Sequence, residues 1–158
     1  HNRTHSFPTR RSSDLDEAYL WGRLATHHSQ ESFVSPMALT WRDALFPESF
    51  EGVAAEPWMR GVLADGERVA FVMLSRTHGR SEGQYLWRLL VDRMHQRRGV
   101  GARVIELVAE ALRADGVSRL LTSIVDGPGS PGPFYARLGF TPTGRDVDGE
   151  TELVLELG

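Results

Sequence analysis

The sequence predicts a single α/β (α+β) domain in which helices cover both faces of a mixed sheet. Two observations carry this prediction. Apolar runs at residues 85–92 and 119–126 flank a helical stripe, which is the pattern of a parallel strand–helix–strand unit. Two further apolar runs, at 58–64 and 68–74, flank Asp65-Gly66, a dipeptide that is typical of a tight hairpin turn.

Helices are expected before this hairpin. Leu20, Trp21 and Leu24 indicate a first helix. In the second, Ser35 is the predicted N-cap and Pro36 the first helical residue, because a polar cap followed by proline favours a helix start. The hairpin strands come next, and residues 77–83 are predicted to form a loop.

The second half of the chain continues the alternation. Residues 85–92 are apolar enough to predict a strand that is buried on both faces. One helical stripe follows, formed by Val100, Val104, Leu107, Val108, Ala111 and Leu112. Gly116 is the predicted residue just past the end of this helix. We then expect a strand at 119–126, a loop at 127–133, a short helix from 134 that Gly139 ends, and a strand at 151–157.

Length and composition fit a globular domain with its own core. The chain has 158 residues, 41% of them apolar and 25% charged. It has no cysteine, which removes disulfides and thiolate metal sites and leads us to expect a cytoplasmic protein. A net charge of −3 and the absence of a long apolar run predict neither a nucleic-acid surface nor a membrane span.

The N-terminal segment is set apart from the domain. Residues 6–15, SFPTRRSSDL, resemble the translation of a sequencing adapter. We therefore expect residues 1–15 to be a disordered artefact and a single domain to cover residues 16–158.

The loop between the central strand and the long helix carries the strongest functional signal. Residues 96–101 read Gln-Arg-Arg-Gly-Val-Gly. A Walker loop would end in Gly-Lys-Ser/Thr, and a dinucleotide fingerprint would need a third glycine at position 104, where valine stands. Glycines at a helix N-terminus, with two arginines beside them, still suit a pyrophosphate.

Two motifs together resemble the GNAT family of N-acetyltransferases. The first is this Q-x-x-G-x-G loop after a strand, and the second is FYARLGF at residues 134–140. The resemblance covers residues 16–158 and implies a mixed, mostly antiparallel sheet. Residues 30–45, QESFVSPMALTWRDAL, are most similar to the branch labelled spermine/spermidine acetyltransferases, although Met37 stands where that branch has asparagine.

The resemblance implies acetyl-CoA as co-substrate, no metal, and transfer of acetyl to a primary amine of a small molecule. A polyamine is one candidate acceptor, and a homodimer is a possible assembly. The cofactor-binding residues it implies are Leu89, Val91, Gln96, Arg97, Arg98, Gly99, Val100, Gly101, Ala102, Ser130 and Phe134. An acetylated protein or peptide amine, or a CoA-binding sensor without catalysis, are the alternatives.

Catalytic roles follow from the same resemblance. Tyr135 is the candidate acid that protonates the departing thiolate, and a backbone N–H near Val91 is the candidate oxyanion donor. Glu82 is the candidate base, with water relays as the alternative. Ser130 is a candidate substitute for the asparagine that family members often place at the position of Pro128. Four acidic residues could attract a cationic amine: Glu31, Asp43, Glu48 and Glu51.

Overall fold

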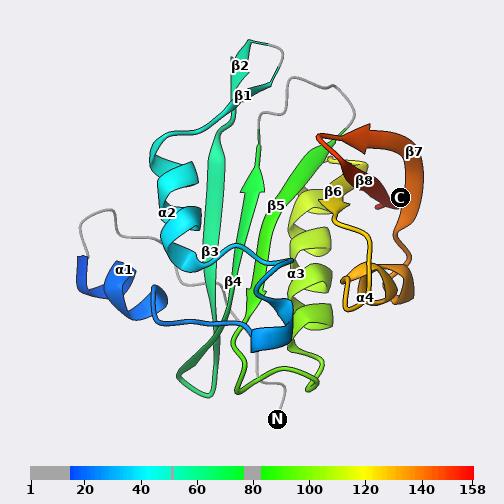
Figure 1. The fold of residues 1–158 in the computed structure, drawn as a ribbon. Coiled ribbons are helices and arrows are strands. Elements are labelled where there is room, and N and C mark those ends of the chain that lie inside the picture. The colour runs from blue at the N-terminus through cyan, green and yellow to red at the C-terminus, as the bar shows by residue number, and fades with distance from the viewer. Residues whose placement is uncertain (1–14, 51, 77–82) are drawn as a thin grey trace.

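The computed structural model describes residues 15–50, 52–76 and 83–158. A six-stranded sheet with the strand order β3-β4-β5-β6-β8-β7 forms its centre (Figure 1). Only β5 and β6 run parallel, and every other neighbouring pair is antiparallel. The predicted class, a mixed and mostly antiparallel sheet with helices on both faces, is therefore confirmed. Its strands are β3 (Pro57–Ala64), β4 (Glu67–Ser75), β5 (Gln84–Val91), β6 (Arg119–Ile124), β7 (Thr141–Val147) and β8 (Glu150–Glu156).

The helices divide between the two faces of this sheet. The long helix α3 (Val100–Ala114) and the short helix α4 (Gly132–Arg137) share one apolar core with β4, β5, β6 and β8. On the other face, α1 (Leu15–Trp21) and α2 (Met37–Leu45) pack on Phe71, Met73 and Leu90. A single 3-10 turn, η1 (His28–Gln30), lies between these two helices. We call the side of α3 and α4 the first face and the side of α1 and α2 the second face.

Helix α3 follows its sequence pattern closely. Its buried residues are Val104, Ile105, Val108, Ala109 and Leu112, which repeat at three and four positions and so form one stripe. At the C-terminus, Gly116 has a φ of 76°, and the amides of Gly116 and Val117 bond to the carbonyls of Arg113 and Leu112. This is a Schellman motif, so the prediction for Gly116 is confirmed.

Two hairpins have the same turn chemistry. Asp65 and Gly66 join β3 to β4 with φ values of 53° and 81°, as predicted. Asp148 and Gly149 join β7 to β8 with φ values of 53° and 85°. The sequence analysis did not predict β7, although the second Asp-Gly was a signal for it. It also missed the small hairpin of β1 (Ser49–Phe50) and β2 (Val53–Ala54).

Several predicted boundaries and burials are wrong. Ser35 is not the N-cap of α2, because Pro36 has an extended ψ of 158° and is itself the cap residue. Trp87, Arg88 and Leu89 are only half-buried, so β5 is not covered on both faces. Strand β6 ends at Ile124 and not at residue 126, and α4 begins at Gly132 and not at residue 134.

Some expectations concern residues outside the described ranges. Residues 1–14 and the greater part of the predicted 77–83 loop are among them, while Leu15 begins α1. Across the described ranges, no helix combines the length and apolarity needed to cross a bilayer. Within these same ranges, His, Asp and Glu side chains do not gather in any group of three able to hold a metal ion.

Candidate active site

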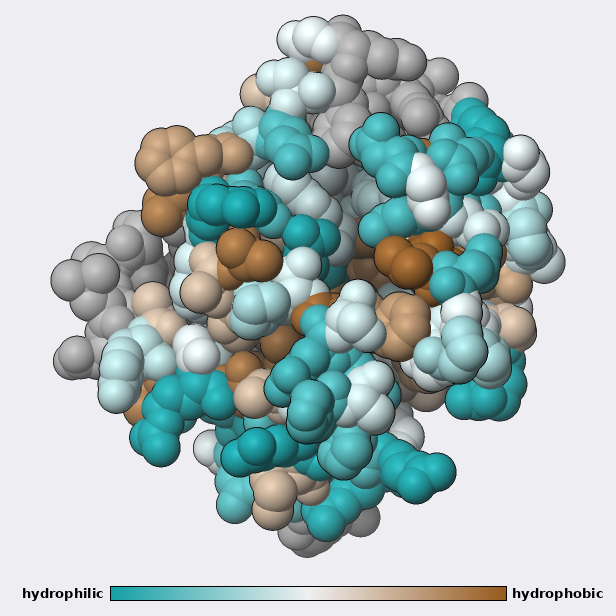
Figure 2. Space-filling view, in the orientation of Figure 1, coloured by the Kyte–Doolittle hydropathy of each residue, from teal (hydrophilic) through white to brown (hydrophobic). Residues whose placement is uncertain are grey.

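A cleft opens where the two central strands separate. Strands β5 and β6 pair through only two residues of each, Gln84 and Tyr85 with Leu120 and Leu121. Beyond this point lies a cleft of about 310 Å³ that is lined by both strands, the segment before α2, α4 and the β7–β8 turn. Figure 2 shows this face of the molecule hollowed between groups of hydrophilic side chains.

A β-bulge in β5 accounts for the separation. Arg88 pairs with Met73 and Leu86 pairs with Leu74, so Trp87 is an extra residue without a partner on β4. An extra residue bends its strand and increases the local twist. This bend carries the second half of β5 away from β6 and leaves an unpaired strand edge facing the cleft.

The register shows which backbone groups lie on that open edge. Directly opposite residues of an antiparallel ladder alternate between pairs that exchange hydrogen bonds and pairs that do not. The amide of Asp92 bonds to the carbonyl of Val69 at 2.9 Å, and the register continues through Val91 and Leu89. The alternation therefore turns the amides of Leu89 and Val91 away from β4 and toward the gap.

The glycine-containing loop joins this edge to α3. Arg97 has a φ of 60° and Gly99, the N-cap of α3, a φ of 77°. A Cβ on Gly99 would meet nothing within 4 Å, so the backbone there is open. The amides of Val100, Gly101 and Ala102 occupy the first turn of α3, where no intrahelical acceptor exists. Arg97 and Arg98 are exposed beside them.

The side chain of Gln96 is hydrogen-bonded within the protein. Its Nε2 donates to the carbonyl of Val91 at 3.0 Å and to Oε1 of Gln30 at 2.9 Å. The side chain thus ties the loop to the end of β5 and to η1. Its amide group is engaged within the protein, so Gln96 holds the loop in place.

Helix α4 meets the loop through Phe134. A Cβ on Gly101 would lie 3.1 Å from Cζ of Phe134 and 3.5 Å from Cγ2 of Val91. Glycine therefore lets the phenyl ring approach the first turn of α3. Ser130 lies just before α4, and its Oγ accepts the amide hydrogen of Gly132 at 3.2 Å. Ser130 and Phe134 do not line the cleft, whereas Tyr135 does.

Tyr135 is buried between aromatic rings. Its side chain is 8% exposed, and its ring centroid lies 5.0 Å from that of Phe134 and 5.1 Å from that of Phe140. Burial raises the pKa of the Tyr135 phenol well above its usual range; the nearby phenol of Tyr85 adds to the rise and a hydrogen bond with Thr122 opposes it. The phenol is therefore protonated at neutral pH.

Thr122 connects Tyr135 to β5. Its Oγ1 donates to the carbonyl of Leu86 at 3.0 Å, and it is the side-chain hydrogen-bond partner of Tyr135. Thr122 thus lies between the phenol of Tyr135 and the backbone of Leu86, beside the point where β5 and β6 separate.

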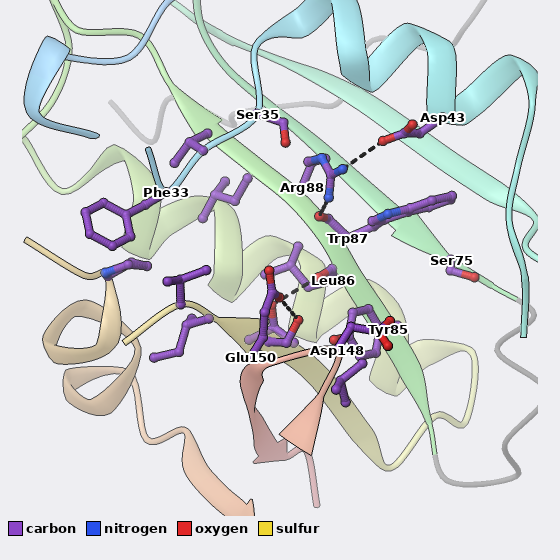
Figure 3. A pocket seen from close by; sticks show the side chains of 18 of the residues that line it. Phe33, Ser35, Asp43, Ser75, Tyr85, Leu86, Trp87, Arg88, Asp148 and Glu150 are labelled. Atoms are coloured by element: carbon purple, nitrogen blue, oxygen red, sulfur yellow. Dashed lines mark hydrogen bonds and ion pairs between the residues drawn. The ribbon is translucent and has the colours of Figure 1, made fainter. Parts of the chain in front are cut away.

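The opposite wall of the cleft carries an ion-pair cluster. Asp43 of α2 is 5% exposed. Its Oδ2 accepts from Nη2 of Arg88 at 2.7 Å, and its Oδ1 accepts from Nη2 of Arg42 at 2.7 Å. Because two guanidinium groups occupy this carboxylate, Asp43 is not an open site for an amine. Figure 3 shows Arg88 and Asp43 on one side of the pocket and Glu150 and Asp148 on the other.

The other acidic residues of the prediction do not all lie at the cleft. Glu48 lines the cleft, whereas Glu31 is exposed and pairs with His28 at 3.3 Å. Glu82 and Glu51 lie outside the described residues. The sequence analysis missed Asp148 and Glu150, which also line the cleft. The second Asp-Gly turn was the signal that could have pointed to them.

Comparisons with known proteins agree with this architecture. The model of the acetyltransferase (GNAT) family matches residues 21–140. No curated protein sequence matches the chain.

Three solved structures are similar over nearly the whole chain. A GNAT acetyltransferase described as putative, from Desulfovibrio desulfuricans, is 17% identical with a TM-score of 0.69, over 98% of this chain and 100% of that one. An aminoglycoside 6'-N-acetyltransferase in complex with coenzyme A is 13% identical with a TM-score of 0.68, over 97% of each chain. A ribosomal-protein alanine N-acetyltransferase from Escherichia coli is 18% identical with a TM-score of 0.66, over 98% of this chain and 95% of that one. At these identities they show a common fold.

Proposed function

The chain belongs to the GNAT family of acetyltransferases, and we propose that it transfers the acetyl group of acetyl-CoA to a primary amine of a small molecule. The observation that carries this proposal is the continuity of three features along the open edge of β5. The amides of Leu89 and Val91 lie on this edge, and the first turn of α3 lies beside Val91 at its end. The buried phenol of Tyr135 lines the cleft where β5 and β6 separate.

The first face offers the parts that acetyl-CoA needs. The first-turn amides of α3, from Val100 to Ala102, and the exposed arginines Arg97 and Arg98 suit the two phosphates of a pyrophosphate. The pantetheine arm contains amide groups, which the open edge of β5 at Leu89 and Val91 can bind as an additional strand would. The arm would pass Phe134 and Ser130 on its way to the gap.

The chemistry requires an oxyanion donor and a proton donor. In this proposal the bound co-substrate supplies a thioester carbonyl, and the amide of Val91 donates a hydrogen bond to its oxygen. Tyr135 gives its proton to the departing sulfur. Glu82 stays the base candidate that the sequence predicts.

The charge of the cleft supports a cationic acceptor. Among the residues that the structure describes, two arginines and four carboxylates line it, so these six groups together carry a formal charge of −2 when all are ionised. A negative cleft concentrates a cationic amine near the gap. A polyamine is therefore the acceptor class that we propose first.

Calorimetric titration of acetyl-CoA tests the first half of the proposal. We expect saturable binding of acetyl-CoA and of CoA, and no binding of NAD under the same conditions. A thiol-release assay with spermidine, a monoamine and an amino acid then tests the second half. A folded protein that binds no acetyl-CoA would refute the function, and one that binds it without acetylating any amine would favour a CoA-binding sensor.

A protein amine is the second candidate acceptor. The similarity to the ribosomal-protein alanine N-acetyltransferase covers 98% of this chain, and that enzyme acts on a protein. Adding peptides with a free N-terminal amine to the same assay distinguishes the two. Higher kcat/KM for peptides than for every small amine would make the protein acceptor the better assignment.

A further inference from the structure

We propose that Glu150 binds the ammonium group of the acceptor amine and takes its proton. This role rests on the acetyl transfer proposed above. It assigns the base to a carboxylate that the fold brings to the cleft from the C-terminal hairpin.

The two faces of β6 place Glu150 opposite Tyr135. Thr122 and Ser123 are consecutive on this strand, so their side chains point to opposite faces of the sheet. Thr122 bonds to Tyr135 on the first face, whereas the hydroxyl of Ser123 donates to Oε2 of Glu150 on the second. The gap between β5 and β6 joins the two sides. An amine held by Glu150 would therefore approach the thioester from the side opposite Tyr135.

Glu150 differs from the other carboxylates of the cleft. Asp43 is occupied by two arginines, and Asp148 and Glu48 are exposed at the rim. Glu150 is half-buried, begins β8, and is held on β6 by Ser123. No arginine or histidine of the described ranges forms an ion pair with it. One oxygen is bonded to Ser123, and the other lone pairs can accept from an ammonium group.

Another glutamate of β8, Glu152, shows the contrast. Glu152, two residues farther along β8, is fully buried, and its Oε2 accepts from Nε of Arg145 at 2.7 Å and from Thr143 at 2.8 Å. Its negative charge is already neutralised within the protein. Glu150 keeps an uncompensated charge at the cleft, which is the property that an ammonium site requires.

The proton and bond changes balance as follows. The acceptor ammonium gives one proton to Glu150 and becomes a neutral amine. Its nitrogen forms a bond to the acetyl carbon, and the bond from that carbon to sulfur breaks. The sulfur takes the proton of Tyr135, the second amine proton restores the phenol, and Glu150 releases its proton to solvent.

Matched substitutions test this assignment. Glu150→Gln keeps the shape and the hydrogen bond to Ser123 but removes the charge. We expect kcat/KM for the acceptor to fall by about 100-fold or more, while the Kd for acetyl-CoA and the thermal midpoint stay close to those of the wild type. Glu150→Asp should recover part of the activity. Glu156→Gln is the control, because Glu156 lies on the same strand, is exposed and forms an ion pair with Arg119.

The outcomes separate the two proposals. If the wild type acetylates an amine and Glu150→Gln stays within threefold of its kcat/KM, the role of Glu150 is refuted while the proposed function stands. A loss in Glu82→Gln without a loss in Glu150→Gln would return the base to Glu82. A wild type that binds acetyl-CoA but acetylates no amine or peptide would overturn the proposed function and the role of Glu150 with it.

Discussion

Substitution of Gly61 by alanine should dislodge Trp21 from the sheet. A Cβ at position 61 would lie 2.2 Å from Cζ2 and 2.5 Å from Cε2 of the indole, whereas ordinary contacts begin at 3.4 Å. Trp21 is 8% exposed and packs beside Phe71, with ring centroids 6.5 Å apart. The indole must therefore move by more than one ångström in a packed environment, or leave it.

The expected cost lies between two limits. Overpacking that the core absorbs by small shifts costs about 1–3 kcal/mol. Full exposure of a tryptophan returns about 150–250 Å² to water, which is worth roughly 4–6 kcal/mol at 25 cal/mol per Å². We expect Gly61→Ala to lower the free energy of unfolding by about 2–4 kcal/mol. For a domain of this size, that corresponds to a fall in Tm of roughly 5–15 °C.

A double-mutant cycle isolates the contact. Urea unfolding of Gly61→Ala, Trp21→Ala and the double variant gives the coupling between the two positions. With the indole absent, alanine at position 61 should cost less than about 0.5 kcal/mol, since Gly61 lies in a strand that tolerates side chains. A single variant as stable as the wild type, or an equal loss in both backgrounds, would refute the steric argument.

Three further predictions concern the site. Tyr135→Phe should lower kcat with the best amine by roughly 10²–10⁴-fold and leave the Kd for acetyl-CoA within threefold; unimpaired turnover would remove Tyr135 as the proton donor. Burial raises the pKa of Tyr135, so the folded state favours the protonated phenol. The stability that this preference contributes is complete below the pKa of the unfolded chain, about 10. It is lost as the pH rises through the higher pKa of the folded protein. The Tm of the wild type should thus fall more steeply above pH 9 than that of Tyr135→Phe, and parallel Tm curves would contradict the pKa shift. Replacing Arg97 and Arg98 with glutamine should raise the Kd for acetyl-CoA by roughly 2- to 20-fold at low salt and less at high salt, whereas an unchanged Kd in calorimetry would show that these arginines do not contact the phosphates.

Local patterns were sufficient for much of the fold. The stripe from Val100 to Leu112 predicted α3 because helix periodicity is a property of neighbouring residues. Asp65-Gly66 predicted its hairpin for a similar reason, since both turn residues need a positive φ. The sequence analysis did not predict strand β7, because Pro142 and Gly144 interrupt its pattern and it lies at the edge of the sheet.

The sequence analysis was wrong about the start of α2 and the burial of β5, which depend on the surrounding structure. The sequence analysis placed the start of α2 one residue too early, with Ser35 as the N-cap in place of Pro36. Only the backbone angles distinguish a cap residue from the first residue of a helix. Strand β5 is as apolar as a strand covered on both faces. It lies half-open because its second half bends away from β6 at the bulge, and no pattern within residues 85–92 records that bend.

The sequence by itself determined the loop before α3, because a glycine with a positive φ and a helix start are local requirements. It pointed to Tyr135 only through the resemblance of residues 134–140 to a family motif. The tertiary structure alone decided the cleft. The bulge at Trp87 depends on the register of β5 against β4, and the bond between Ser123 and Glu150 joins residues 27 positions apart. The ion pair of Asp43 with Arg88 spans 45 positions. Such contacts form only when the packing of the whole sheet brings distant segments together, so the charge that lines the cleft is a property of the fold.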